Sequence, residues 1–363
     1  MQVKITGLIV MHLTLVALGQ DYYPRKDAAF GQVAVGGGIE TVINLTNRGT
    51  YLYTGSIRFL RGQGSVWNPL VNGTAIVNGE YALEIQPKST ATIRLTGDQL
   101  ESGAAVAVSQ DLLLDNFIEA NLTYFVRSGE SVTDSVGVSP SKEFYLASVP
   151  FQDLESIALA LVNGDLSGER VAHVLLRLFT EGGSQLETKS LELGSFFHDA
   201  SFLSELFPGL DLERGKVEIS SDIPIFGTAL TLEEGEISSL PLEPSPVAYT
   251  VRMISSEGSV ATGEMALWAE GFFVKGYFLI SAIDEEPLPE AVLELVNGQL
   301  FDQFLQLSFA VSEDPFFAEE ATLYFEHTNF SFDSDVVSDS WVQMFLSDHA
   351  TLEGTYELSR RTD

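Results

Sequence analysis

The chain reads Ile43-Asn44-Leu45-Thr46-Asn47 and repeats this pattern, more than a hundred positions later, as Leu159-Ala160-Leu161-Val162-Asn163. In both copies the first and third residues are apolar, which is the period-two pattern of a half-buried β-strand. Both copies end in asparagine. A repeat of this kind predicts that each copy belongs to one structural unit of the same design.

Further matches extend the repeat in the same order along the chain. They pair Ile57-Arg58-Phe59-Leu60 with Leu176-Arg177-Leu178-Phe179, Leu83-Glu84-Ile85 with Leu191-Glu192-Leu193, and Val106-Ala107-Val108-Ser109 with Val217-Glu218-Ile219-Ser220. The spacing between matched segments changes by 3 to 11 residues, so we expect the length differences to lie in loops. Neither copy carries a catalytic motif.

Turn residues divide both copies into short strands. Gly36-Gly37-Gly38 and Asn72-Gly73 are two such signals, and they recur at intervals of about 8–12 residues, which is typical of a β-sandwich. We therefore predict an all-β chain that begins with two tandem β-sandwich domains, residues 28–145 and 146–245.

One short helix is expected in the second domain. Asp199 is placed to cap its first turn, the apolar residues between Phe202 and Phe207 have helical spacing, and Pro208-Gly209 ends it. The apolar face of this helix is predicted to cover the open end of the sandwich core. Binding of a partner helix is the alternative.

The third part of the chain, residues 247–363, follows the proline-rich segment 241–246 and is rich in aromatic residues. It holds 18 of the 38 Phe, Trp and Tyr residues. Glu270-Gly271 and Asn297-Gly298 are both predicted as hairpin turns. Six to eight hairpin-linked strands predict an antiparallel up-and-down barrel or a third sandwich.

Residues 1–19 have the pattern of a signal peptide. Lys4 precedes an apolar stretch, and the small residues of Ala17-Leu18-Gly19 predict cleavage before Gln20. A buried N-terminal strand is the alternative. No segment reaches the ~20 apolar residues that a membrane helix needs, so no transmembrane segment is expected. We expect a secreted, periplasmic or cell-surface protein.

The composition restricts the partners and the host. The chain has 51 acidic and 19 basic residues, a net charge of −32, and no cysteine. Such a charge repels nucleic acid and anionic membranes, so neither is expected as a partner. A solvated acidic surface is the simplest interpretation, and a basic partner or calcium is the alternative. An exported chain without disulfides depends on core packing, which favours a bacterial origin.

No residue pattern indicates catalysis. The nucleophile elbow, the zinc-protease helix, the P-loop and the dinucleotide motif are all missing from the sequence. The four histidines that follow residue 19 are widely spaced: His173, His198, His327 and His349. A Ser-His-Asp triad assembled through space would make the protein a secreted hydrolase, and this is one alternative. We expect a protein that is not an enzyme and has no cofactor.

Two weak site patterns lie in the third part of the chain. Asp333, Asp335 and Asp339 place three carboxylates in a short loop, and calcium accepts such ligands, although the EF-hand pattern is not matched. A solvated acidic loop is the alternative interpretation.

The second pattern is aromatic. Trp268, Phe278 and Trp341 are candidates for the lining of an apolar ligand cavity, because a barrel of ~8 strands either fills its interior or holds one small ligand. A filled core is the alternative interpretation of these side chains.

The first two domains resemble a poorly characterised group of exported bacterial proteins built from tandem β-sandwich domains. The resemblance covers residues 28–242 and rests on the glycine run 36–38, the strand that follows it, and the segment Thr54-Gly55-Ser56-Ile57-Arg58-Phe59. Ile39 departs from the group, whose members often have an aromatic residue after the glycines. The resemblance implies a fold but no activity. Residues 352–356 are loosely similar to the closing strand of lipocalin-like barrels.

These observations predict a non-enzymatic, extracytoplasmic binding or structural module whose ligand is unknown. We expect its partner at the cell surface or outside the cell. A carrier of a small apolar ligand or lipid in the C-terminal barrel is the first alternative, and the secreted hydrolase is the second.

Overall fold

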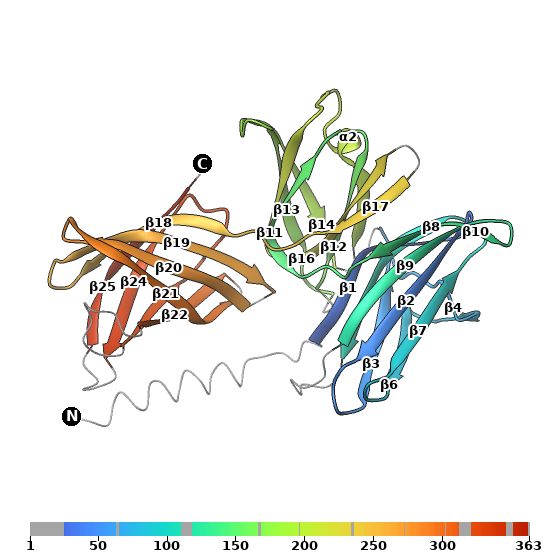
Figure 1. Ribbon diagram of the computed structural model, residues 1–363, viewed down its shortest axis with the longest axis horizontal. Helices are drawn as coiled ribbons and strands as arrows, with labels where there is room; N and C mark the ends of the chain where they lie inside the picture. Colours follow the sequence, from blue (N-terminus) through green and yellow to red (C-terminus); the bar gives the residue numbers. More distant parts are fainter. Residues whose placement is uncertain are drawn as a thin grey trace.

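The computed structural model describes residues 25–62, 65–109, 118–165, 168–195, 197–233, 236–271, 273–301, 303–311, 321–345 and 351–361. The predicted signal peptide, residues 1–19, lies outside these ranges. The described residues form three β units in chain order, with one short helix (Figure 1). Among these residues there is no helix long and apolar enough to cross a membrane.

The first unit is a sandwich of two antiparallel sheets. The first sheet has the order β1 (Arg25–Val35), β8 (Glu101–Ser109), β3 (Tyr53–Leu60), β6 (Glu80–Ile85). The second has the order β10 (Ser131–Val138), β9 (Ile118–Ser128), β2 (Ile39–Asn47), β7 (Thr90–Thr96), β4 (Leu70–Val71), β5 (Thr74–Ala75). Alternate residues such as Ile43 and Leu45 are fully buried between the sheets, as the period-two pattern predicts.

The second unit is a sandwich in which one long strand, β16 (Gly215–Glu233), belongs to both sheets. Its first half pairs with β11 (Phe144–Phe151) and β13 (Ala172–Thr180), and β13 pairs with β14 (Gln185–Leu193). Its second half pairs with β12 (Ile157–Asn163) and β17 (Glu236–Pro241), and β12 pairs with β15 (His198–Phe202).

The two sandwiches have the same strand order. The sheet β1-β8-β3-β6 corresponds to β11-β16-β13-β14, and the sheet β10-β9-β2-β7 corresponds to β17-β16-β12-β15. Strand β16 therefore occupies the positions in both sheets that β8 and β9 occupy separately in the first unit. This arrangement confirms the predicted pair of tandem β-sandwiches.

One predicted match is wrong by a single residue. Arg58 lies opposite Val106, whereas its counterpart Arg177 lies opposite Glu218 rather than Val217. The core-facing residues of the first copy are thus Ala105 and Ala107. Because both faces of this segment are apolar in the first copy, its sequence could not reveal which face is buried.

The predicted helix exists but is short. Helix α2 (Leu203–Leu206) places Leu203 and Leu206 in the core of the second sandwich, as predicted. The predicted cap is wrong, because Asp199 lies in β15 and pairs with Leu161. Instead, the carboxylate of Glu205 accepts a hydrogen bond from the backbone N–H of Phe202, which satisfies one free donor at the helix start.

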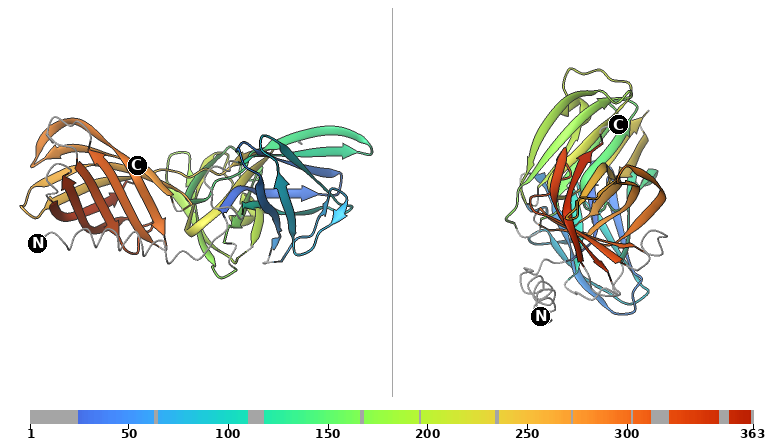
Figure 2. Two further views of the ribbon diagram at one scale, coloured as in Figure 1. Left: turned by 90° about the horizontal axis from the view of Figure 1, so that it is seen from below. Right: turned by 90° about the vertical axis from the view of Figure 1, so that its left-hand side faces the viewer.

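The third unit is an eight-stranded antiparallel barrel in which each strand pairs with the next and the last pairs with the first. Its strands are β18 (Val247–Ser255), β19 (Val260–Glu270), β20 (Phe273–Ile283), β21 (Glu286–Phe301), β22 (Phe304–Val311), β23 (Ala321–His327), β24 (Val336–Phe345) and β25 (Thr351–Arg360). The barrel confirms one of the two architectures predicted for residues 247–363. The second sandwich lies between the barrel and the first sandwich (Figure 2).

Only one of the two predicted hairpin turns of the barrel is correct. Gly271 joins β19 to β20 with a φ of +62°, which glycine adopts without strain. Asn297 and Gly298 instead lie inside β21, paired with β22. A Cβ atom at Gly298 would lie 2.4 Å from the carbonyl oxygen of Val274, so this glycine is required by close strand packing and not by a turn.

Candidate functional site

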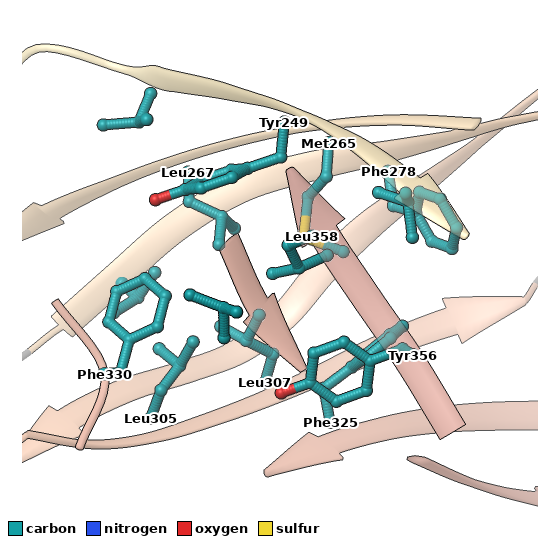
Figure 3. Packing of buried hydrophobic residues seen from close by; sticks show 14 of the residues in the cluster. Tyr249, Met265, Leu267, Phe278, Leu305, Leu307, Phe325, Phe330, Tyr356 and Leu358 are labelled. Carbon is teal, nitrogen blue, oxygen red and sulfur yellow. The ribbon is translucent and has the colours of Figure 1, made fainter. Parts of the chain in front are cut away.

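The barrel interior is packed with aromatic and aliphatic side chains (Figure 3). The ring of Phe325 makes edge-to-face contacts with Phe278, Phe309 and Tyr356, at centroid distances of 6.1, 5.7 and 5.0 Å. Such geometries stabilise aromatic clusters beyond the burial of their area. The described interior therefore corresponds to the filled core that the sequence left open as an alternative.

The structure separates two of the three aromatic residues that were predicted to line a ligand cavity, Trp268 and Phe278. Phe278 is fully buried in the barrel core. Trp268 alternates with the core residues Leu267 and Ala269 and is partly exposed, so it lies on the outer wall. The side chain of Trp341 lies outside the described residues, although its backbone pairs with Phe325 in β23.

The three aspartates predicted to bind calcium have different partners. The carboxylate of Asp333 accepts hydrogen bonds from Arg177 and Ser220 in the second sandwich. An oxygen of Asp339 lies 3.3 Å from Nδ1 of His327. Asp335 is exposed. The described part of the chain contains no group of three acidic or histidine side chains that could hold a metal ion.

The histidines considered for a triad lie in different surroundings. His173 is exposed and lies 3.9 Å from Glu192, His198 is buried beside Gln32 of the first sandwich, and His327 contacts Asp339 in the barrel. His349 lies outside the described residues. The three described histidines therefore do not share a site.

The joint between the two sandwiches is mainly apolar. A cluster of five residues from the first unit packs against Val162 and Phe226 of the second: Ala29, Leu60, Ala104, Val106 and Val108. At its margin Nε2 of His198 lies 2.8 Å from Oε1 of Gln32. Burial lowers the pKa of His198 to about 4, against a smaller opposing effect of a hydrogen bond with the backbone of Gly31, so this imidazole is neutral at pH 7.

The joint between the second sandwich and the barrel is built around four charges, which we call the latch: Arg177, Glu218, Asp333 and Arg360. Each arginine contacts both carboxylates. The N–O distances are 3.1 Å for Arg177–Glu218, 2.8 Å for Arg177–Asp333, 3.1 Å for Arg360–Glu218 and 3.4 Å for Arg360–Asp333. All four side chains are at most 30% exposed, so water screens these pairs only partly.

The surroundings of Asp333 and Arg177 in the latch favour their charged forms. Burial alone would raise the pKa of Asp333, but hydrogen bonds from Arg177 and Ser220 and the charges of both arginines outweigh it, and the pKa is lowered. Burial alone would lower the pKa of Arg177, but its hydrogen bonds and attraction to Asp333 and Glu218 raise it. Asp333 and Arg177 therefore stay ionised at neutral pH.

A short linker touches all three units. Ser141 donates a hydrogen bond to the carbonyl of Gly227 in the second sandwich. Lys142 lies 3.3 Å from Glu270 of the barrel. Glu143 pairs with Lys26 of the first sandwich. We call Ser141-Lys142-Glu143 the hub segment, because it lies where the three units meet.

The two joints use the same face of each sandwich. In the first unit the outer face of β8 and β3 presents Val106, Val108 and Leu60 to the next unit. In the second unit the equivalent face of β16 and β13 presents Glu218 and Arg177 to the barrel. The docking geometry is thus repeated while its chemistry changes from apolar to ionic.

Sequence reasoning missed the latch, although one signal was present. An arginine recurs at the same repeat position, Arg58 and Arg177, and the residue opposite it on the central strand is Val106 in the first copy but Glu218 in the second. That difference between otherwise similar strands could have indicated a new contact. Nothing in the sequence pattern identifies Asp333 or Arg360 as the partners.

Two hollows lie near these residues. A cavity of ≈ 20 Å³ at the second joint is lined by Tyr145, Ser221 and Phe332, among others. The hydroxyl oxygen of Ser221 is buried there without a hydrogen-bond partner, and the space suits one water molecule. A polar groove of ≈ 400 Å³ lies over β18, β24 and β25, with Arg252 and Glu357 in its wall.

Compared with known proteins, the chain matches no protein-family model, no curated protein and no solved structure.

Proposed function

We propose that the protein is an exported, non-catalytic binding or structural module in which three docked β units form one extended scaffold. The observation that carries this proposal is the repeated docking face, which is the outer face of β8 and β3 in the first sandwich and of β16 and β13 in the second. Buried polar side chains at the joints contact a neighbouring unit. Arg177 and Glu218 contact the barrel, and His198 contacts Gln32 of the first sandwich. Side chains that face a neighbouring unit are not available to a substrate.

The polar groove over β18, β24 and β25 is the surface that best suits a partner. It combines the charges of Arg252 and Glu357 with the hydroxyl groups of Ser338 and Thr355. A mixed polar lining of this kind favours a hydrogen-bonding partner at the cell surface over an anionic one, since the chain as a whole has a net charge of −32.

The proposal is tested on residues 20–363, purified as one chain. We expect small-angle X-ray scattering at 0.15 M salt to give a single extended particle with the three units docked, and no turnover of an ester, glycoside and peptide panel. In the host bacterium, protease added to intact cells should degrade the protein. Turnover that survives repurification, or full protection from protease together with a cytoplasmic location, would falsify the proposal.

A further inference from the structure

The negative charge is distributed unevenly over the three units. Residues 28–145 carry 11 acidic and 7 basic residues, a net charge of −4. Residues 146–245 carry 17 and 5, a net charge of −12, and residues 247–363 carry 21 and 4, a net charge of −17. The product of the net charges across the second joint is therefore about four times that across the first, and Coulomb repulsion scales with it.

This repulsion acts over a long distance. Compact domains of this size have radii of about 17 Å, so the centres of two touching domains lie roughly 35 Å apart. The Debye length is about 30 Å at 0.01 M ionic strength and about 8 Å at 0.15 M. Dilute buffer therefore leaves the repulsion between the second sandwich and the barrel in force, and physiological salt removes most of it.

The latch acts over a short distance and responds to salt much less. Its four N–O contacts are 2.8–3.4 Å long, and partly buried pairs are screened far less than separated surface charges. Tyr145 and Leu146 of β11 add apolar contact, because both are buried in the barrel's core cluster. Lys142 of the hub segment also pairs with Glu270.

We propose that the second joint is a hinge controlled by ionic strength. At physiological salt the latch and the apolar contacts of β11 hold the barrel against the second sandwich. In dilute solution the mutual repulsion of the two acidic units opens the joint and exposes the latch. The first joint stays closed under both conditions, because its contacts are apolar and the first sandwich is only weakly charged.

Distance measurements on the whole chain test this hinge. The protein has no cysteine, so pairs of cysteines can be introduced and labelled for energy transfer. Glu187→Cys with Val296→Cys spans the second joint, and Val77→Cys with Glu187→Cys spans the first; all three positions are exposed. We expect transfer across the second joint to fall when salt is lowered from 0.15 to 0.01 M, by at least about a third, and transfer across the first to stay constant.

Two matched variants separate the latch from net charge. Asp333→Asn and Asp335→Asn each remove one negative charge from the same loop, but only the carboxylate of Asp333 contacts Arg177 and Arg360. If net charge alone controlled the joint, both variants would favour its closed form, because each reduces the repulsion between the two units. The latch predicts that Asp333→Asn opens it, raising the ionic strength at half-opening about threefold, while Asp335→Asn lowers that value slightly.

These distance measurements can reject the latch and the hinge separately. Equal shifts in the two variants reject the latch. Transfer that is constant in the unmodified protein between 0.01 and 0.15 M, or that falls only above 0.15 M, rejects the hinge. Neither result depends on whether the protein has a partner or an activity, so failure of the hinge leaves the proposed scaffold function to be judged by its own experiment.

Discussion

The asparagine that ends the repeated strand makes the sharpest prediction. Asn47 is fully buried. Its amide donates to the carbonyls of Tyr51 and Ile85, at 2.7 and 3.0 Å, and its oxygen accepts from the N–H of Gly49, at 2.8 Å. The second copy repeats the arrangement around Asn163. One side chain thus satisfies three backbone groups at the edge of each core.

Replacing Asn47 by alanine should destabilise the first sandwich strongly. The contacts with Ile85 and Gly49 are buried, and a buried backbone group left without a partner costs about 1–3 kcal/mol. We therefore expect the free energy of unfolding to fall by about 3–4 kcal/mol. Asn47→Asp should be no milder, because its carboxylate cannot donate to the carbonyls that the amide contacts.

The assay is urea unfolding followed by tryptophan fluorescence. Trp67 is the one tryptophan of the first sandwich, so replacing Trp268 and Trp341 by phenylalanine isolates its signal. Asn44→Ala is the matched control, since Asn44 lies on the same strand but makes only exposed side-chain hydrogen bonds. We expect less than about 1 kcal/mol for that change. If Asn47→Ala were no more harmful than Asn44→Ala, the reasoning would be refuted.

Three further predictions concern other parts of the molecule. The pKa of His198 is about 4 in the folded protein, against 6.5 for an unperturbed imidazole, so the unfolded chain binds the proton first as the pH falls. The free energy of unfolding should therefore decrease by about 3 kcal/mol in total between pH 6.5 and pH 4. His198→Asn should remove this part of the pH dependence of urea unfolding. Phe325→Ala should destabilise the barrel by about 3–5 kcal/mol in thermal unfolding, whereas Trp268→Ala should cost under about 1.5 kcal/mol. Gly103→Ala should weaken the first sandwich measurably in the same assay, because its Cβ would lie 2.2 Å from the carbonyl oxygen of Leu60.

The sequence predicted the units well because each unit is made of local patterns. Alternating apolar residues and turn signals recur within a few residues of one another, and the two copies supported each other. The paired asparagines, Asn47 and Asn163, were visible as matching strand ends before their hydrogen bonds were known. The number of hairpin-linked strands predicted a barrel or a third sandwich for the last unit, and the barrel is the one that forms.

Predictions that depended on which face of a strand is buried were less reliable. Residues 265–269 read Met-Ala-Leu-Trp-Ala, which is apolar on both faces, so hydrophobicity could not assign Trp268 to the outer wall. The same ambiguity caused the one-residue error at β8. The contacts between units could not be predicted from the sequence for a different reason. Arg177 and Asp333 are 156 positions apart, and no local pattern encodes such a pairing.

The course of β16 also has a mechanical consequence. The chain enters the second sandwich at Phe144, opposite Ile225, and leaves it at Pro241, opposite Thr228. These points on β16 are three residues apart, so a tension applied between the first sandwich and the barrel would be carried across the base of the second sandwich. The pull would unzip β11 and β17 from their ends and leave the rest of that core unstretched. The strain in this unit would thus be confined to two of its strands, although the unit is the middle of the chain (Figure 1).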